Sequence, residues 1–302
     1  MGTTYHVTVV GNVVDPEALK AKIDAVLVQV NREMSTYDPH SELMALNGSP
    51  IGVEFDLSEA LAFLLQESAA IHRDTGGAFD ITVGPLVNRW GFGPDADQAP
   101  PRPQEVKALM ARVGFQHLQF NDDGTRVTRK RDVFVDLSAI AKGYGVDQVA
   151  LLLAGEGYRD YLVEIGGELR LAGNNPLGKP WRIAVERPQL VPGSMQAAIN
   201  VTEAAVATSG SYRNFKWVDG KQLSHTIDPA TGWPVDHQLV SVTVIAKTCA
   251  RADALATAFS VMGPEKTLAF AEQHALPVFM LEQQGGELVE RWSTSFASYI
   301  DD

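Results

Sequence analysis

The stretch of residues 224–234 combines a titratable imidazole with a sharply turning chain. His225 lies at the end of an extended run, and Asp228-Pro229 and Thr231-Gly232 follow it. Proline fixes φ, glycine accepts φ > 0 and an aspartate can cap its own turn, so these residues predict a tight, rigid turn. An imidazole beside such a turn is suited to general-base chemistry. The same residues also fit a strand that ends in an ordinary surface turn.

A second candidate site lies on a segment of small residues, 249–259, that is predicted to be helical. Asp253 and Thr257 are four residues apart, so they share one helix face. A carboxylate and a hydroxyl placed in this way suit a hard cation such as Mg²⁺, which prefers oxygen ligands. The alternative is that the two side chains cap the helix or bond back to its own backbone.

Two further residues could contact a ligand. Tyr37 lies in a polar segment, 34–43, that is predicted to be a loop, where its ring could stack on a flat ligand or pack under the loop. Asp80 follows the pair Gly76-Gly77, at a point where backbone can approach a ligand closely. Asp80 could instead be a plain helix cap.

Two segments could hold phosphate. Residues 133–136 are predicted to form a buried strand that delivers Asp136 to the start of a helix, and a helix N-terminus favours anions. This junction is neither a Walker A motif nor a Gly-x-Gly-x-x-Gly fingerprint, so no standard nucleotide fold follows from it. The hydroxyl-rich end of the predicted strand in 205–213 could bind phosphate oxygens or form a polar turn.

The elements that must position these residues alternate between helices and hairpins. This order favours an α+β fold over a strict βαβ sheet. One helix is predicted to start at 15–16, one to run from Ser58 to Thr75 and one to lie near 104–113. A further helix is predicted to follow the strand at 133–136 and to continue to 153, another to span 249–259, and a short one to begin after 263–264. Strands are predicted at 3–10, 161–165, 169–171, 181–186, 197–201, 239–246, 278–281 and 288–292, with a hairpin turn at 121–124.

Composition excludes several classes of function. The 37 acidic against 25 basic residues in 302 argue against a general nucleic-acid binder and against binding to anionic membranes. The single cysteine, Cys249, excludes an internal disulfide and a thiolate-ligated zinc or iron–sulfur site within one chain. No apolar run approaches the ~20 residues of a transmembrane helix, and no signal peptide precedes the first strand. Either the protein is cytosolic or its targeting segment lies outside this sequence.

Taken together and in order, the motifs resemble the FAD:protein FMN transferase (ApbE) family over nearly the whole chain. The matching stretches are 1–5, 35–38, 76–80, 135–143, 165–168, 207–210, 224–232 and 252–257. The resemblance implies an ApbE-like α+β fold with mixed or antiparallel sheets, flanking helices and an FAD cleft between two subdomains. It implies a single domain over 1–302. The stretch 91–103 is rich in Pro, Gly and Asp and has no apolar periodicity, so it is the candidate for a subdomain boundary or a long surface loop.

The resemblance also assigns roles to individual positions. It implies that His225 is the catalytic residue, and that the main-chain carbonyl of Ala139 with Asp253 and Thr257 forms a Mg²⁺ site. The positions that fall where the family holds FAD are Met1, Tyr37, Ala78, Phe79, Asp80, Asp136, Lys142 and Ile227.

The implied reaction is Mg²⁺-dependent transfer of FMN from FAD to a threonine or serine hydroxyl of an acceptor flavoprotein, with release of AMP. The implied acceptor carries this hydroxyl in a small-residue motif, as in subunits of membrane redox complexes. The alternatives are an FAD pyrophosphatase, in which water replaces the hydroxyl, and a non-catalytic FAD-binding protein. The family also implies a periplasmic location, with an inner-membrane lipid anchor whose signal precedes Met1, and a cytoplasmic form is the other expectation.

Overall fold

The strands of the described chain pair only in antiparallel fashion, as a chain rich in hairpins predicts. The computed structural model describes residues 2–93, 99–186, 195–210, 215–218 and 221–300. The chain divides into two compact units. Unit 1 comprises Met1–Val28, Lys142–Arg213 and His237–Asp302, and unit 2 comprises Gln29–Ala141 and Asn214–Asp236. The chain combines helices with antiparallel sheets, so the α+β prediction is confirmed.

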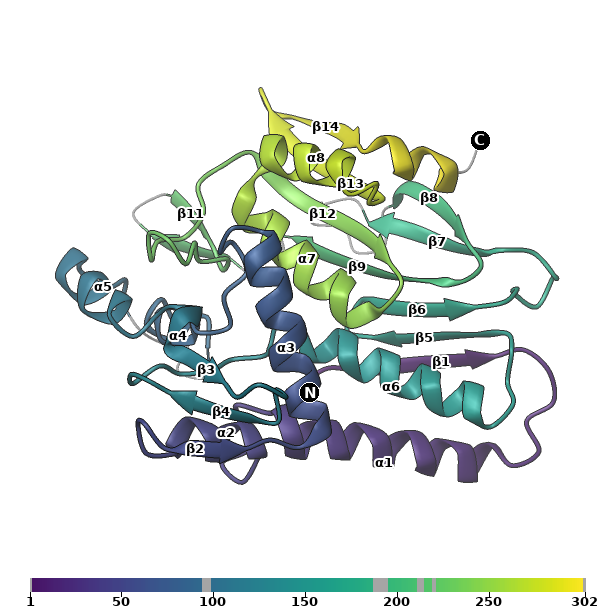
Figure 1. Cartoon of the computed structure of the whole chain (residues 1–302). Helices are drawn as coiled ribbons and strands as arrows, with labels where there is room; N and C mark the ends of the chain where they lie inside the picture. The colour runs from purple at the N-terminus through teal and green to yellow at the C-terminus, as the bar shows by residue number, and fades with distance from the viewer. Residues whose placement is uncertain (1, 94–98, 187–194, 211–214, 219–220, 301–302) are drawn as a thin grey trace. The chain divides into compact units, whose positions relative to one another are not determined.

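Unit 1 is built on a seven-stranded sheet in the order β1-β5-β6-β9-β12-β13-β14 (Figure 1). Its strands are β1 (Tyr5–Val9), β5 (Tyr161–Ile165), β6 (Glu168–Ala172), β9 (Ala204–Gly210), β12 (Leu239–Ala246), β13 (Val278–Gln284) and β14 (Glu287–Trp292). The remaining pair, β7 (Trp181–Glu186) and β8 (Met195–Val201), forms a separate two-stranded sheet. Helices α1 (Pro16–Met34) and α6 (Ala141–Gly155) each cross a unit boundary, whereas α7 (Cys249–Met262), α8 (Pro264–Gln273) and the 3-10 helix η2 (Thr294–Tyr299) lie within unit 1.

Both faces of this sheet are covered, because side chains alternate between faces along each strand. On one face Val163 of β5 packs with residues of α1 and α6, including Ile23 and Val149. On the other face Leu162 packs against a cluster that contains residues of β7, β8 and η2. A sheet buried on both sides is a rigid support for residues at its strand ends.

Unit 2 combines short helices with two small sheets. Strands β2 (Glu54–Asp56), β4 (Arg126–Arg129) and β3 (Leu118–Phe120) form one sheet, and β10 (Phe215–Val218) pairs with β11 (Lys221–Ser224). The helices are α2 (Glu42–Gly48), α3 (Glu59–Asp74), α4 (Gly84–Arg89), α5 (Pro103–Met110) and the 3-10 helix η1 (Phe115–His117). One core cluster of unit 2 joins Leu86, Trp90, Val106, Val113 and Ile227.

Local signals placed several element ends correctly. Asp15 accepts a hydrogen bond from Ala18 N at 2.9 Å, which caps the start of α1 as predicted. Ser58 caps α3 in the same way, through Leu61 N at 3.2 Å. The predicted turn at 121–124 joins β3 and β4.

The predicted strand at 133–136 is wrong. Among the described residues this segment pairs with no strand, although Val133 and Val135 are buried. Its backbone groups instead make individual hydrogen bonds to a side chain and to a non-strand backbone carbonyl. The Asn47 amide bonds both the N–H and the carbonyl of Val135, at 2.7 and 2.8 Å, and Asp136 N donates to Ile81 O at 2.8 Å. A side chain from α2 thus replaces the neighbouring strand.

Two helices were missed. The predicted loop 34–43 overlaps the start of α2, which Ser41 caps through Met44 N at 3.1 Å. Helix α4, which begins four residues after Asp80, was not predicted, although Pro85 in its first turn is a helix-start signal. The stretch 91–103, only part of which is described, lies within unit 2. In the described chain no helix is both long and apolar enough to span a membrane.

Candidate active site

Glu168 of unit 1 is positioned by a tight turn between β5 and β6. Gly166 and Gly167 connect the two strands with φ of 62° and 103°, a conformation that glycine adopts readily. The turn pairs Ile165 with Glu168 at the first position of β6. The Glu168 side chain is buried, with 6% of its surface exposed.

A close approach of two helices places Asp253. A Cβ atom added to Gly143 of α6 would lie 2.3 Å from the carbonyl oxygen of Cys249, at the start of α7. Because position 143 has no side chain, its N–H reaches Oδ2 of Asp253 at 3.1 Å. This N–H belongs to the first turn of α6, where backbone donors have no partner within the helix. The Asp253 carboxylate therefore satisfies the N-terminus of α6.

Lys142, whose side chain is 34% exposed, forms a carboxylate–lysine cluster with the buried Glu168 and Asp253. The Lys142 Nζ lies 2.5 Å from Oε1 of Glu168 and 3.5 Å from Oδ1 of Asp253. Burial alone would lower the pKa of Lys142, but the Asp253 and Glu168 charges raise it above its ordinary value, so the ammonium form is favoured. Burial, followed by the Asp253 charge, raises the pKa of Glu168 to about 7, although Lys142 opposes this shift.

The cluster has unused capacity for a cation. With both carboxylates ionised it carries one net negative charge, and Oε2 of Glu168 has no hydrogen-bond partner among the described residues. Asp253 and Thr257 lie one turn apart on α7, as predicted, and both offer oxygen atoms. These hard donors fit Mg²⁺. No group of three or more His, Cys, Asp or Glu in the described residues could hold a metal, so water and substrate oxygens would complete the coordination.

His225 of unit 2 follows β11 directly and is half-buried. The turn after it has the predicted aspartate cap, since Oδ1 of Asp228 accepts from Ala230 N at 2.8 Å. The Gly232 N–H donates to Asp228 O at 2.8 Å, and Gly232 has a φ of 76°. A Cβ at Gly232 would come within 2.8 Å of Val106, so close packing as well as conformation requires glycine here.

Aromatic residues that sequence reasoning did not select surround this turn. The Trp90 Nε1–H donates to Gly232 O at 2.9 Å, and the ring centroids of Trp90 and Trp233 are 5.2 Å apart. The Phe92 ring meets the His225 ring edge to face, with centroids 6.3 Å apart. Trp90 directly precedes the predicted loop 91–103, and Phe92 lies in it. In such a segment only the size of their side chains could have indicated that they pack beside the turn.

The residues assigned to FAD by resemblance have different environments. Phe79 and Ile227 are buried, with 2% and 4% exposed, whereas Tyr37 is 71% exposed. Ala78 and Asp136 are half-buried, and Oδ1 of Asp136 accepts from Ser138 N at 2.9 Å ahead of α6. Asp80 is not a helix cap, because both its oxygens bond elsewhere within unit 2. Met1 and residues 211–213 lie outside the described residues.

The residues assigned to a metal by the resemblance are divided between the units. Asp253 and Thr257 belong to unit 1, and Ala139, which is half-buried, lies in unit 2 just before α6. The catalytic candidate His225 also belongs to unit 2.

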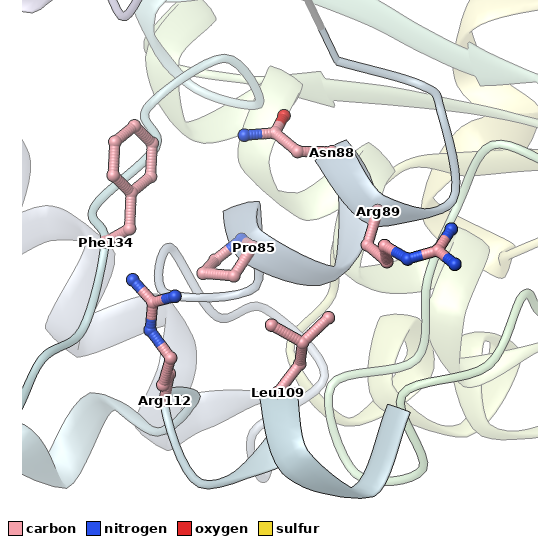
Figure 2. Close-up of a pocket in the computed structure, with 6 residues that line it drawn as sticks. All are labelled: Pro85, Asn88, Arg89, Leu109, Arg112 and Phe134. Atoms are coloured by element: carbon pink, nitrogen blue, oxygen red, sulfur yellow. The ribbon is translucent and has the colours of Figure 1, made fainter. Parts of the chain in front are cut away.

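A separate cavity of about 300 Å³ lies within unit 2, beside α4 (Figure 2). Its lining residues are Pro85, Asn88, Arg89, Leu109, Arg112 and Phe134. Both arginines already have carboxylate partners, Arg89 with Glu105 at 2.9 Å and Arg112 with Asp132 at 3.1 Å. Figure 2 shows the Arg89 guanidinium pointing away from Phe134. None of the residues proposed from the sequence lines this cavity.

Comparison with known proteins places this α+β fold in a family. The ApbE family profile matches residues 1–280, so the chain belongs to the ApbE family. It is 42% identical over 304 residues to the FAD:protein FMN transferase of Vibrio cholerae, covering 99% of this chain and 90% of that protein. It is 40% identical over 305 residues to the Escherichia coli protein of the same name, covering 99% and 87%.

Solved structures agree with this membership. The flavin transferase ApbE from Vibrio cholerae superposes with a TM-score of 0.91, covering 99% of this chain and 96% of that chain at 42% identity. The ApbE protein from Thermotoga maritima gives 0.88 at 29% identity, covering 100% and 97%. The ApbE-like fold expected from the sequence is thus confirmed.

Proposed function

We propose that this chain transfers FMN from FAD to a threonine or serine hydroxyl of an acceptor protein, in a Mg²⁺-dependent reaction that releases AMP. The observation that carries the proposal is the Asp253 carboxylate, held by Gly143 N at the N-terminus of α6 inside an oxygen-rich cluster that is net negative when Glu168 is ionised. Such a cluster favours a divalent cation, and a helix N-terminus favours phosphate. The names of the relatives, FAD:protein FMN transferase, support the same reaction class.

The metal site would use oxygen atoms only. Asp253 and Thr257 would supply side-chain oxygens, and Ala139 its main-chain carbonyl. When bound, Mg²⁺ would neutralise charge on the FAD pyrophosphate and polarise its phosphorus atoms. The residues proposed to hold FAD are Met1, Tyr37, Ala78, Phe79, Asp80, Asp136, Lys142 and Ile227.

His225 is the group proposed to remove the proton of the acceptor hydroxyl. The acceptor hydroxyl attacks the FMN-side phosphorus, the P–O bond to the AMP phosphate breaks, and AMP leaves with the bonding electrons. His225 takes the hydroxyl proton as a general base. The aspartate-capped turn and the Trp90 hydrogen bond hold the backbone that follows His225, which supports a fixed imidazole position.

The function is tested by incubating the protein with FAD, Mg²⁺ and an acceptor that carries a threonine in a small-residue motif. Wild type should add the mass of FMN to the acceptor, and His225→Ala should slow this labelling by about 10²–10⁴-fold, since a general base contributes that much. His274→Ala, at an exposed histidine on another element, serves as the control.

Three outcomes would contradict the proposal. AMP release without a mass change in any acceptor would make the protein an FAD pyrophosphatase. Intact FAD after hours with Mg²⁺ would make it a binding protein. Labelling by His225→Ala at the wild-type rate would remove the assigned base.

A further inference from the structure

The two contacts of Lys142 within the carboxylate–lysine cluster are unequal. Its ammonium lies 2.5 Å from Glu168 but 3.5 Å from Asp253. Only the first contact is a hydrogen bond. Glu168 is thus the main partner of Lys142, and Asp253 is its neighbour.

The two oxygens of Asp253 are also unequal. Oδ2 accepts from the Gly143 backbone, so its position is set by the contact between α6 and α7. Oδ1 faces the Lys142 ammonium without a hydrogen bond at 3.5 Å. Oδ1 is therefore the oxygen that a cation could take, and Lys142 is the protein group that would compete for it.

Glu168 has features that its ion pair alone does not require. Its side chain is more than nine-tenths buried, yet Oε2 has no partner among the described residues. An unsatisfied buried acceptor costs about 1–3 kcal/mol, so a group that supplies a hydrogen-bond donor or positive charge is expected nearby. The glycine turn before Glu168 holds it at one register position, opposite Ile165.

We propose that Glu168 is a positioning residue for the cation site, because it binds the Lys142 ammonium and keeps Oδ1 of Asp253 available to the metal. This inference rests on the proposed Mg²⁺-dependent function. Without the Glu168 charge, the nearest anion to Lys142 is Asp253. The ammonium would then pair with Asp253 and displace the divalent cation by direct competition. Such partners of metal ligands commonly change metal affinity about 10- to 100-fold.

The test is a titration of Mg²⁺ into FAD-saturated protein without acceptor, in which flavin fluorescence reports Mg²⁺ binding. All variants carry His225→Ala, so that the readout is binding and not turnover. Glu168→Gln, which keeps the shape and removes the charge, should raise the dissociation constant for Mg²⁺ about tenfold or more. Glu168→Asp, which keeps the charge, should recover part of this loss. Glu203→Gln, at an exposed position outside the cluster, is the control.

The double variant separates competition from a structural effect. In a Lys142→Met background there is no ammonium to compete, so Glu168→Gln should change the dissociation constant less than about twofold. A tenfold loss that persists in this background would overturn the proposal. So would a Glu168→Gln single variant that binds Mg²⁺ as the Glu203→Gln control does.

Failure of the inference and failure of the proposed function give different results. If the parent protein shows no Mg²⁺ dependence of flavin fluorescence, the metal-dependent function itself is wrong. If Glu168→Gln does not fold, Lys142→Met alone decides. Because Lys142 is also assigned to FAD, Mg²⁺ is then titrated calorimetrically into FAD-free protein, where the Mg²⁺ affinity should be unchanged or tighter and a tenfold loss would overturn the proposal.

Discussion

At the scale of single residues, Asp80 has a structural role that its assignment to FAD does not reveal. Its Oδ1 accepts from both Thr82 N and Thr82 Oγ1, at 2.8 and 2.6 Å, and its Oδ2 accepts from Phe115 N at 3.1 Å. The Thr82 hydroxyl in turn accepts from Gly114 N at 2.7 Å. A buried carboxylate with three donors therefore ties the segment before α4 to η1.

We expect Asp80→Asn to destabilise the protein in the absence of FAD. An amide nitrogen cannot accept a hydrogen bond, so one of the buried donors of Asp80 loses its partner, at a cost of about 1–3 kcal/mol. Urea unfolding followed by circular dichroism measures this loss against Asp122→Asn, at an exposed turn position. If the two variants unfold alike while only Asp80→Asn binds FAD weakly, Asp80 would be a ligand-binding residue without a structural role.

At the scale of elements, the geometry of the carboxylate–lysine cluster depends on the approach of α6 to α7. Gly143 allows this approach, and Asp147 of α6 accepts from the first two backbone N–H groups of α7, Cys249 and Ala250, both at 2.9 Å. Each helix therefore caps the other at its N-terminus. Because Lys142 and Asp253 lie on these two helices, the crossing sets the 3.5 Å distance between them.

Gly143→Ala tests the helix crossing. The new Cβ would lie 2.3 Å from Cys249 O, and because that neighbour is backbone the helices must separate. We expect a loss of about 1–3 kcal/mol in unfolding free energy together with weaker Mg²⁺ binding. Gly155→Ala, in the last turn of the same helix with no atom within 4 Å of the new Cβ, is the matched control. Equal stability of the two variants in thermal unfolding would contradict the role of this contact.

At the scale of the whole molecule, the formal net charge of −12 opposes the binding of an anionic dinucleotide. FAD binding by an acidic chain therefore needs local positive charge. Lys142 supplies one such charge, but its two carboxylate neighbours outweigh it when Glu168 is ionised. A divalent cation at Asp253 would reverse the sign of the cluster, which links the electrostatics of the whole chain to the proposed metal.

We expect chelation of divalent cations to weaken FAD binding about tenfold or more, which corresponds to about 1.4 kcal/mol or more. Mg²⁺ should restore the affinity, whereas KCl at equal ionic strength should not. The measurement is an equilibrium titration of FAD with and without chelator. Asp253→Ala should bind FAD weakly and be insensitive to the chelator. Tight FAD binding in chelator would exclude a metal role in binding.

The sequence by itself determined the features that depend on near neighbours in the chain. Residues such as Asp15, Ser58 and the turn at 228–232 carry their structural signals within a few positions, because caps and turns form from local backbone bonds. Strand alternation and helix periodicity likewise identified most elements. The ordered motifs were sufficient to recognise the ApbE family.

Tertiary structure alone decided which groups meet. Lys142 and Glu168 are 26 residues apart, and Gly143 and Asp253 are 110 apart, so no local pattern relates them. The extended segment at 133–136 was mistaken for a strand because hydrophobicity reports burial and not the identity of the hydrogen-bond partner, which here is the Asn47 side chain. The distances at Lys142 follow from helix packing around Gly143 and from a glycine turn, and these depend on the whole fold of unit 1.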